Sequence, residues 1–247
     1  MAKVLLAGES WIVSTTEYKG YDSFTSSKLE SGCDHLIDEL EKNGHQVTHL
    51  FAHNVQEQFP WTMDELNKYD VIILSDIGSN SFLLSHRVFD EGHTTVNRLD
   101  LLKKWVINGG SLMMAGGYLS FGGFEGKAHY HNTPIEDILP VNVLPYDDRC
   151  EMPQGVKPLV KEDSNITKGL GEFPDILGYQ ELQVKPDSKV LMTVNKSPLL
   201  VIRKVGKGKT LAYASDIAPH WAPEEFMNWS GYGKFFSRCI DWLANVN

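Results

Sequence analysis

Three short apolar runs constrain the fold more than any other feature of this sequence. They are KVLLAG at residues 3–8, DVIILSD at 70–76 and SLMMA at 111–115. A run that is apolar without alternation is typical of a strand covered on both faces, as in a parallel sheet. Helical patterns separate the runs, so the first half of the chain predicts β–α–β units with right-handed crossovers.

Local signals place the elements between these strands. A helix is predicted over residues 33–43, because Cys33, Leu36, Ile37 and Leu40 have helical spacing and Gly44 follows as a stop. A second helix is expected over 95–108 and a strand at 46–51. Thr62, with Glu65 three residues later, indicates the start of a short helix. The segment 9–24, rich in polar and aromatic residues, is interpreted as a loop.

The second half changes character. Alternating runs at 190–194, 198–204 and 209–216 predict antiparallel strands, while 145–185, with many Pro and Gly, is expected to form long surface excursions. The chain closes on a helix with an apolar stripe from Tyr232 to Leu243. We therefore predict a three-layer α/β/α fold with a mixed, mostly parallel sheet, forming a single domain over residues 1–247.

Composition excludes several classes of function. The chain has 23 basic and 32 acidic residues and no basic cluster, which argues against a nucleic-acid partner. No run approaches the ~18–20 apolar residues of a membrane span, and the N-terminus reads as a strand rather than a signal peptide. Three widely spaced cysteines argue against a disulfide framework or a zinc site and indicate a cytoplasmic protein.

Four loops leave the carboxyl ends of predicted strands, where open α/β sheets bind their ligands. They lie at residues 8–11, 75–80, 116–134 and 215–221 and carry polar and aromatic groups. We expect these loops to converge on one crevice that takes a small-molecule ligand. The candidate ligand-binding residues are Glu9, Trp11, Asp76, Gly116, Gly117, Ser120, His131 and Trp221.

The turn after residue 115 is the first candidate for chemistry. Its Gly pair permits positive φ and close backbone approach, so backbone N–H groups there could bind a developing anion. A tight turn packed by Tyr118 is the alternative. Tyr118 is a weak nucleophile because its ordinary pKa is near ~10, and YLSFG around Ser120 lacks the first Gly of a G-x-S-x-G elbow.

Two histidine-containing segments supply further candidates. Asp216 and His220 could form an acid–base unit after the last strand, while Glu224 and Glu225 suit the start of a helix. His129 and His131 share a face if their segment is extended, so they could hold a metal or simply make local hydrogen bonds. We expect no metal or other cofactor. Cys33, on the apolar stripe of its helix, is interpreted as a structural thiol.

The segments GESW, KGYDSF, SDIGSN, GGYLSFGGFEGKAHYHNTP, YDDR and DIAPHW, taken in this order, resemble the putative glutamine amidotransferase family. This family belongs to the class I glutamine amidotransferase-like superfamily. The resemblance implies a flavodoxin-like α/β/α fold with its site at the turn after residue 115 and at the late histidine.

The same resemblance shows where this sequence departs from the catalytic motifs of the superfamily. A working glutaminase of the superfamily has a Cys in a G-x-C-x-G-type elbow and a His-x-Glu pair after a late strand. Here Tyr118 stands at the Cys position, and the acid after His220 is Glu224, two residues further on than the pattern requires. Hydrolysis of glutamine by a thiolate is therefore not expected.

Three functions remain open from sequence. The first is a protein that keeps the superfamily's pocket without its thiol and binds or acts on a small polar molecule, such as a sugar, with His220, Asp216 and Tyr118 as catalytic candidates. The second is a non-catalytic binding or regulatory subunit. The third is metal-assisted hydrolysis through His129 and His131. The sequence leaves the oligomeric state open, with a homo-oligomer as one alternative.

Overall fold

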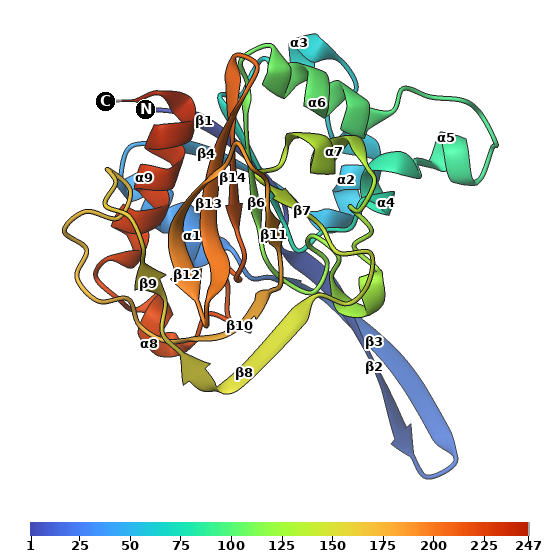
Figure 1. Ribbon diagram of the computed structural model, residues 1–247. Helices are drawn as coiled ribbons and strands as arrows, with labels where there is room; N and C mark the ends of the chain where they lie inside the picture. Colours follow the sequence, from blue (N-terminus) through green and yellow to red (C-terminus); the bar gives the residue numbers. More distant parts are fainter. Residues whose placement is uncertain (247) are drawn as a thin grey trace.

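The computed structural model describes residues 1–246 and is built around an eight-stranded mixed sheet (Figure 1). Its strands, in spatial order, are β4 (Gln46–Leu50), β1 (Lys3–Gly8), β5 (Val71–Ser75), β6 (Ser111–Ala115), β14 (Gly208–Tyr213), β13 (Ser197–Val205), β12 (Lys189–Val194) and β9 (Leu159–Val160). The first five run parallel, and the last three are added antiparallel. The predicted mixed, mostly parallel sheet is confirmed.

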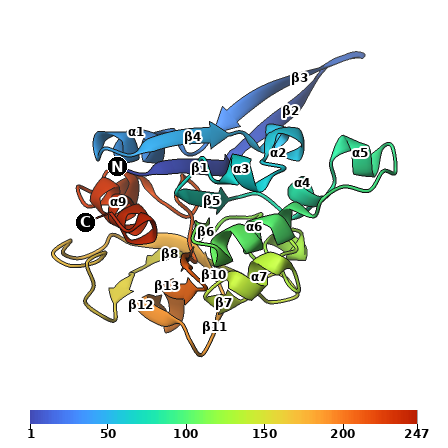
Figure 2. The same cartoon turned by 90° about the horizontal axis from the view of Figure 1, so that it is seen from above.

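Helices cover both faces of this sheet and complete three layers (Figure 2). On one face lie α1 (Asp34–Lys42) and α9 (Tyr232–Ala244), and on the other lie α2 (Ala52–Gln58), α3 (Met63–Leu66) and α6 (Arg98–Ile107). The shorter helical segments are α4 (Asn80–Leu83), α5 (His86–Phe89), η1 (Phe124–Gly126), α7 (Pro134–Ile138) and α8 (Glu224–Met227). Among the described residues, no helix combines the length and apolarity needed to span a membrane.

The helix starts and apolar stripes predicted from the sequence can be compared with the observed helices. Thr62 and Glu65 form the predicted capping box at the start of α3. The helix expected from residue 95 begins instead at Arg98, because the Asn97 side chain accepts hydrogen bonds from the N–H groups of Leu99 and Asp100. The apolar stripe of α9 is buried from Tyr232 to Leu243. Helix α2 was not predicted.

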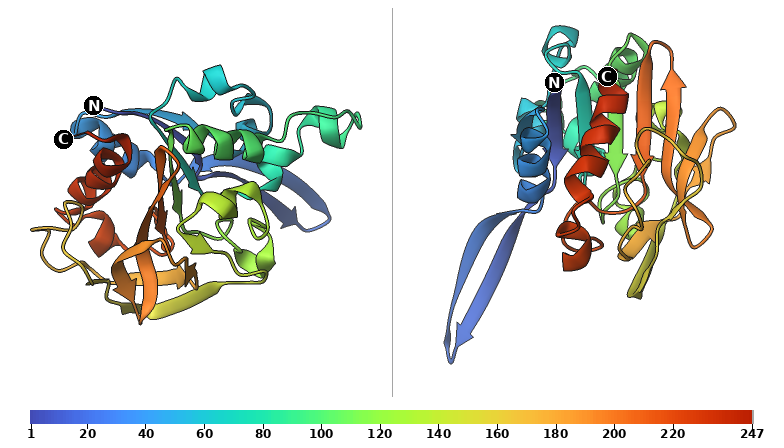
Figure 3. Two further views of the ribbon diagram at one scale, coloured as in Figure 1. Left: turned by 45° about the horizontal axis from the view of Figure 1, so that its top comes forward. Right: turned by 90° about the vertical axis from the view of Figure 1, so that its left-hand side faces the viewer.

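Segment 9–24 is not a loop, and that prediction was wrong. It belongs to a β-hairpin formed by β2 (Ser10–Lys19) and β3 (Asp22–Ser31), which projects from the body of the molecule (Figure 3). A two-residue turn at 20–21, with Gly20 at φ +67°, joins the strands. Neither face of the hairpin is buried, so the sequence lacks the apolar alternation that marks a half-buried strand.

Residues 145–185 are also more ordered than expected. They contain β8 (Arg149–Val156) and β10 (Ile176–Gln180), which pair antiparallel beside the main sheet. A second small ladder joins β7 (Val141–Asn142) to β11 (Gln183–Val184). Strand β8 places charged side chains next to the turn after β6, which matters for the site.

A buried arginine ties three helices together. Arg98 is fully buried at the start of α6. Its guanidinium donates to the backbone oxygens of Val55 at 3.0 Å and Ser81 at 3.2 Å, and its Nε donates to that of Phe82 at 2.8 Å. These carbonyls belong to α2 and α4, so one side chain fixes both helices against α6. Carbonyl groups in place of a carboxylate satisfy the buried cation.

Candidate functional site

A pocket of about 190 Å³ opens at the carboxyl end of the central strands. Its polar groups follow four neighbouring strands: Glu9 follows β1, Asp76 follows β5, Tyr118 follows β6 and Asp216 follows β14. Parallel strands end at one edge of a sheet, so the fold brings these residues together. The full lining is Glu9, Trp11, Asp76, Tyr118, Asp216, Pro219 and His220, and all but Pro219 are predicted site residues.

Sharp backbone turns aim two of the carboxyl groups. Glu9 and Asp76, each directly after its strand, have left-handed φ angles of +49° and +45°. The preceding residue of the first turn, Gly8, has φ +105°, and a Cβ there would lie 1.9 Å from the Ser75 carbonyl oxygen. Left-handed conformations of non-glycine residues cost of order 1 kcal/mol or more and cluster at functional sites. Both of these strained residues lie where their strands meet the pocket.

Two of the three carboxyl residues in the pocket lining, Glu9 and Asp216, are buried. Glu9 is 2% exposed and Asp216 is 4% exposed. Ser75 Oγ donates to Glu9 Oε2 at 2.5 Å, and the Ala218 N–H donates to Asp216 Oδ1 at 3.0 Å. Burial, and then the charges of the neighbouring carboxylates, raises the pKa of Glu9 and of Asp216 well above the usual range. No Lys or Arg lines the pocket to offset this repulsion.

The turn after β6 already holds a carboxyl group of the protein itself. The Leu119 N–H donates to Asp76 Oδ1 at 2.7 Å, while the Gly116 N–H faces the carbonyl oxygen of Tyr213 at 2.8 Å. Gly117 has φ +142°, and a Cβ there would lie 3.1 Å from Asp76 Oδ1. The glycine is needed so that the carboxylate can approach. These contacts take up donors that the sequence interpretation had assigned to a substrate anion.

Tyr118 forms one wall of the pocket through its ring. Its edge-to-face contact with His220 has a centroid distance of 4.3 Å, and the Arg149 guanidinium lies 4.6 Å from its ring centre. Its hydroxyl donates to Glu151 Oε1 at 3.1 Å. Burial and the Glu151 charge raise the pKa of Tyr118, so the phenol is not poised to act as a nucleophile.

Asp216 and His220 face each other across the pocket floor. His220 Nδ1 lies 3.7 Å from Asp216 Oδ2. Burial lowers the pKa of His220 and raises that of Asp216. A neutral imidazole beside a carboxyl group that holds its proton can act as a base and an acid, respectively. The pair is therefore competent for proton transfer to and from a bound hydroxyl group.

Five of the predicted ligand-binding residues do not line the pocket, namely Gly116, Gly117, Ser120, His131 and Trp221. Ser120 is buried, and its Oγ accepts the Asp76 N–H at 3.0 Å. Trp221 is also buried, stacks beside His220 and donates from Nε1 to Glu151 at 3.0 Å. His131 does not line this pocket. It borders a separate cavity of about 590 Å³, where its Nδ1 lies 2.8 Å from the Val143 carbonyl oxygen.

The basis for pairing His129 with His131 also changes. His129 has φ +57°, so the segment is not the extended strand from which a shared face was inferred. Within residues 1–246, one group of three side chains brings metal-ligating atoms within 4.8 Å of one another. Its members are Cys33, Asp34 and His49. The two loop histidines are not part of that group.

None of the three cysteines can replace the missing nucleophile. Cys33 and Cys239 are buried, and Cys150 is half-buried in β8. Burial raises the pKa of the Cys33 thiol to about 12 and also raises that of Cys150. A thiol is nucleophilic as its thiolate, so these environments suppress reactivity.

Sequence reasoning missed three supporting residues from 149–180. Arg149 and Glu151 of β8 contact the ring and the hydroxyl of Tyr118, and Gln180 of β10 donates to the Gly117 carbonyl oxygen. Arg149 ends the YDDR motif, which was noted only for the resemblance. The alternation of charged residues at 149 and 151 was the signal that could have indicated a strand facing the site.

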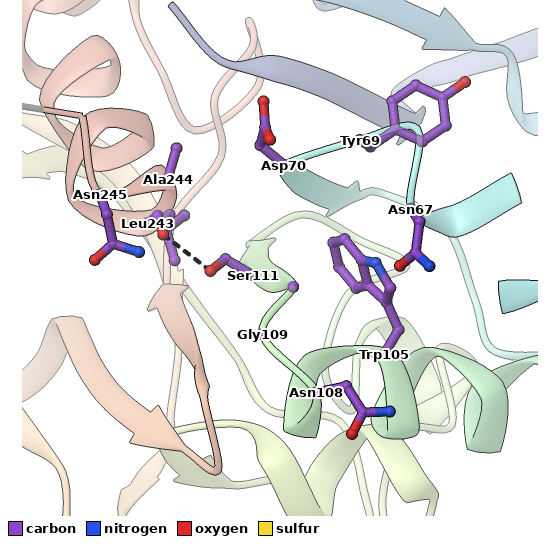
Figure 4. Close-up of a pocket in the computed structure, with 11 residues that line it drawn as sticks. Asn67, Tyr69, Asp70, Trp105, Asn108, Gly109, Ser111, Leu243, Ala244 and Asn245 are labelled. Atoms are coloured by element: carbon purple, nitrogen blue, oxygen red, sulfur yellow. Dashed lines mark hydrogen bonds between the residues drawn. The ribbon is translucent and has the colours of Figure 1, made fainter. Parts of the chain in front are cut away.

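A second hollow, of about 270 Å³, lies at the opposite end of the sheet (Figure 4). It surrounds the amino ends of β5 and β6, where Asp70 accepts the Lys3 N–H at 2.7 Å and Ser111 Oγ donates to the Leu243 carbonyl oxygen at 2.9 Å. Asp70 is the one carboxylate in its lining. The hollow lacks the convergence of acids, imidazole and aromatic rings found at the carboxyl ends.

Comparisons with known proteins agree with this architecture. A family model described as "Putative glutamine amidotransferase" matches residues 3–245. "Cytoplasmic Protein STM3548 from Salmonella typhimurium" is 43% identical, with a TM-score of 0.94 over 97% of this chain and 98% of that one. "Cytoplasmic Protein STM1381 from Salmonella typhimurium LT2" is also 43% identical, with a TM-score of 0.93 over 98% and 99% of the two chains.

A more distant likeness concerns the fold alone. A "Putative thua-like protein from Bacteroides uniformis ATCC 8492" is 12% identical, with a TM-score of 0.56 over 98% of this chain and 90% of that one. No curated protein matches the sequence. The family model and the two structures at 43% identity nevertheless agree over almost the whole length. The chain therefore belongs to the family described as "Putative glutamine amidotransferase", as the sequence motifs predicted.

Proposed function

We propose that this chain binds a small polyhydroxylated molecule, such as a sugar, in the pocket at the carboxyl ends of β1, β5, β6 and β14. The observation that carries the proposal is the combination of three carboxyl groups, two of them buried, with three rings, those of Trp11, Tyr118 and His220, around one pocket. Carboxyl groups accept hydrogen bonds from hydroxyl groups, and aromatic rings pack on the apolar faces of a sugar ring.

The size of the pocket limits the ligand. Sites for drug-sized molecules usually measure ~300–1,000 Å³, and this pocket has about 190 Å³. A single sugar unit or a smaller polyol suits that space. Any turnover of the bound molecule depends on His220 and Asp216, whose protonation states suit a base and an acid. A cytoplasmic location is part of the proposal and is supported by the names of the two relatives.

Two features argue against glutamine as the substrate. Tyr118 stands where the working glutaminases of the superfamily carry their Cys, and no thiol lines the pocket. The Asp76 carboxylate also accepts the N–H of Leu119, the residue after the nucleophile position. A negative tetrahedral intermediate at that position would meet this carboxylate instead of a free donor.

A thermal-unfolding screen of monosaccharides, polyols, amino acids and nucleotides tests the proposal. A ligand at 100 times its Kd stabilises the folded protein by ~2.7 kcal/mol. We expect a monosaccharide or polyol to give such a shift in the wild type, and Trp11→Ala and Asp216→Asn to abolish it. Asp70→Asn, in the hollow at the opposite end, is the control and should leave the shift intact. Stabilisation by amino acids or nucleotides alone, or a shift that survives both pocket variants, would contradict the proposal.

A further inference from the structure

The hairpin of β2 and β3, here called the arm (residues 10–31), has little support from the rest of the chain. It projects from the body in every view (Figures 1 and 3). At its base, Ser10 Oγ accepts the Ala52 N–H at 2.7 Å, and from Trp11 outward its side chains are exposed or half-buried. A two-stranded hairpin by itself is marginally stable in water. An arm of ten residues per strand therefore needs a surface to lie on.

Charge is sorted completely between the two faces of the arm. Residues paired across antiparallel strands share a face, and the register pairs Trp11 with Glu30, Val13 with Lys28, Glu17 with Phe24 and Lys19 with Asp22. All five charged residues of the arm lie on this face. Salt bridges Lys19–Glu17 and Lys28–Glu30 connect them. This face therefore holds every charge of the arm, together with the apolar side chains of Trp11, Val13 and Phe24.

The opposite face carries no charge. It presents the pairs Ile12–Leu29, Ser14–Ser27 and Thr16–Thr25, with Tyr18 nearest to the tip. The hydroxyl oxygens of each of the two middle pairs lie 2.9 Å apart. Ile12 is 58% exposed, Leu29 49% and Tyr18 79%. An uncharged face with exposed apolar side chains at both ends is typical of a sheet face that is covered in an assembly.

We propose that this uncharged face packs against the same face of a second copy's arm, so that the arm is a dimerisation element. A two-fold contact places one face against the same face of the other copy, and an uncharged face meets no charge repulsion in that arrangement. The chain has a net charge of −9, so two copies repel each other over most of their surfaces. An uncharged face is a surface on which two copies can meet without that repulsion. Serine and threonine hydroxyls both donate and accept, so two copies of the hydroxyl ladder are complementary.

The dimensions of the arm show that the dimer needs contacts beyond the uncharged face. Ten residues at ~3.3 Å each give a strand of roughly 33 Å, and two strands present a face of about 300 Å² per copy. That is less than the ~800 Å² per partner of a stable interface. In an antiparallel pair of arms, each tip reaches the body of the other copy beside the base of its arm. Tyr18 and Tyr21, both strongly exposed at the tip, then extend the contact.

Two substitutions of equal exposure on opposite faces test the inference. Leu29, on the uncharged face, is 49% exposed, and Phe24, on the charged face, is 48% exposed. By light scattering during size-exclusion chromatography, the wild type and Phe24→Lys should be dimeric and Leu29→Lys monomeric. Tyr18→Lys provides a second disruption near the tip. Circular dichroism and the unfolding midpoint of the body should show that each variant is folded.

Three outcomes of this experiment would contradict the proposed dimer. A monomeric wild type, a dimer that survives both Leu29→Lys and Tyr18→Lys, or equal dissociation by Phe24→Lys would each overturn the proposal. The assay needs no ligand, so its outcome is independent of what the pocket binds.

Discussion

The wild type should lose stability as the pH rises, because its buried carboxyl groups hold protons that the unfolded chain releases. Replacing Glu9 by Gln should make this loss smaller. Glu9 lies near Asp76 and Asp216 with no Lys or Arg in the pocket lining, and burial raises its pKa well above the usual range. The folded protein therefore holds a proton on this group where the unfolded chain releases it. Gln keeps an oxygen that can accept the Ser75 hydroxyl and removes the titration.

The sign and size follow from proton linkage. Because the folded state binds the extra proton, the free energy of unfolding falls as the pH rises from about 4.5, the ordinary pKa of Glu, towards the raised pKa of the folded state. Each such proton contributes a slope of ~1.4 kcal/mol per pH unit. The variant lacks one titrating carboxyl group. Its stability relative to the wild type should therefore increase by about this amount per pH unit within that window.

Urea unfolding of the two proteins at a series of pH values from 5 to 8 measures this difference. The slope is the useful quantity, because an unpaired Gln amide would shift all points by a constant amount. Glu225→Gln, an exposed position at the start of α8, is the matched control and should leave the slope unchanged. A Glu9→Gln curve parallel to that of the wild type would refute the view that the pocket holds a buried proton.

Three further substitutions test other parts of the structure. His220→Ala should abolish turnover of any substrate found by screening while the unfolding midpoint stays close to that of the wild type; unchanged turnover would remove His220 from the acid–base pair. Arg98→Ala should destabilise the fold by about 3 kcal/mol or more in urea unfolding, because buried carbonyl groups from α2 and α4 lose their donors; a loss below ~1 kcal/mol would contradict this. Gly117→Ala should lower stability by roughly 1 kcal/mol or more and weaken ligand binding, since φ +142° and contact with Asp76 Oδ1 both oppose a Cβ; wild-type binding would contradict the assigned turn geometry.

The strand ends could be predicted from the sequence because parallel topology leaves them little freedom. The apolar runs ending at Gly8, Ser75 and Ala115 became neighbouring strands, so the residues after them had to meet. That geometry, and not any single motif, brings Glu9, Asp76 and Tyr118 to one pocket. The alternating run at 209–216 predicted a further strand, and Asp216 and His220 lie at its carboxyl end.

The features that were missed depend on contacts that local patterns do not encode. Trp221 reads like a ligand-facing ring beside His220, but the sequence could not show that it turns inward to Glu151. His131 follows the same loop as the pocket residues, yet a turn with left-handed φ at His129 directs it to another cavity. The arm escaped detection because both of its faces are exposed, which removes the burial pattern that identifies a strand.

Ammonia release from glutamine tests the central claim most directly, namely that the chain keeps its family's fold without the thiol chemistry of the superfamily's working glutaminases. The wild type should release no ammonia above the background of buffer alone, because Tyr118 occupies the nucleophile position and the thiols are buried or half-buried outside the pocket lining. Ammonia release that is saturable in glutamine and lost in Cys33→Ser would contradict the account, since it would show that a buried thiol with a raised pKa still performs glutamine hydrolysis.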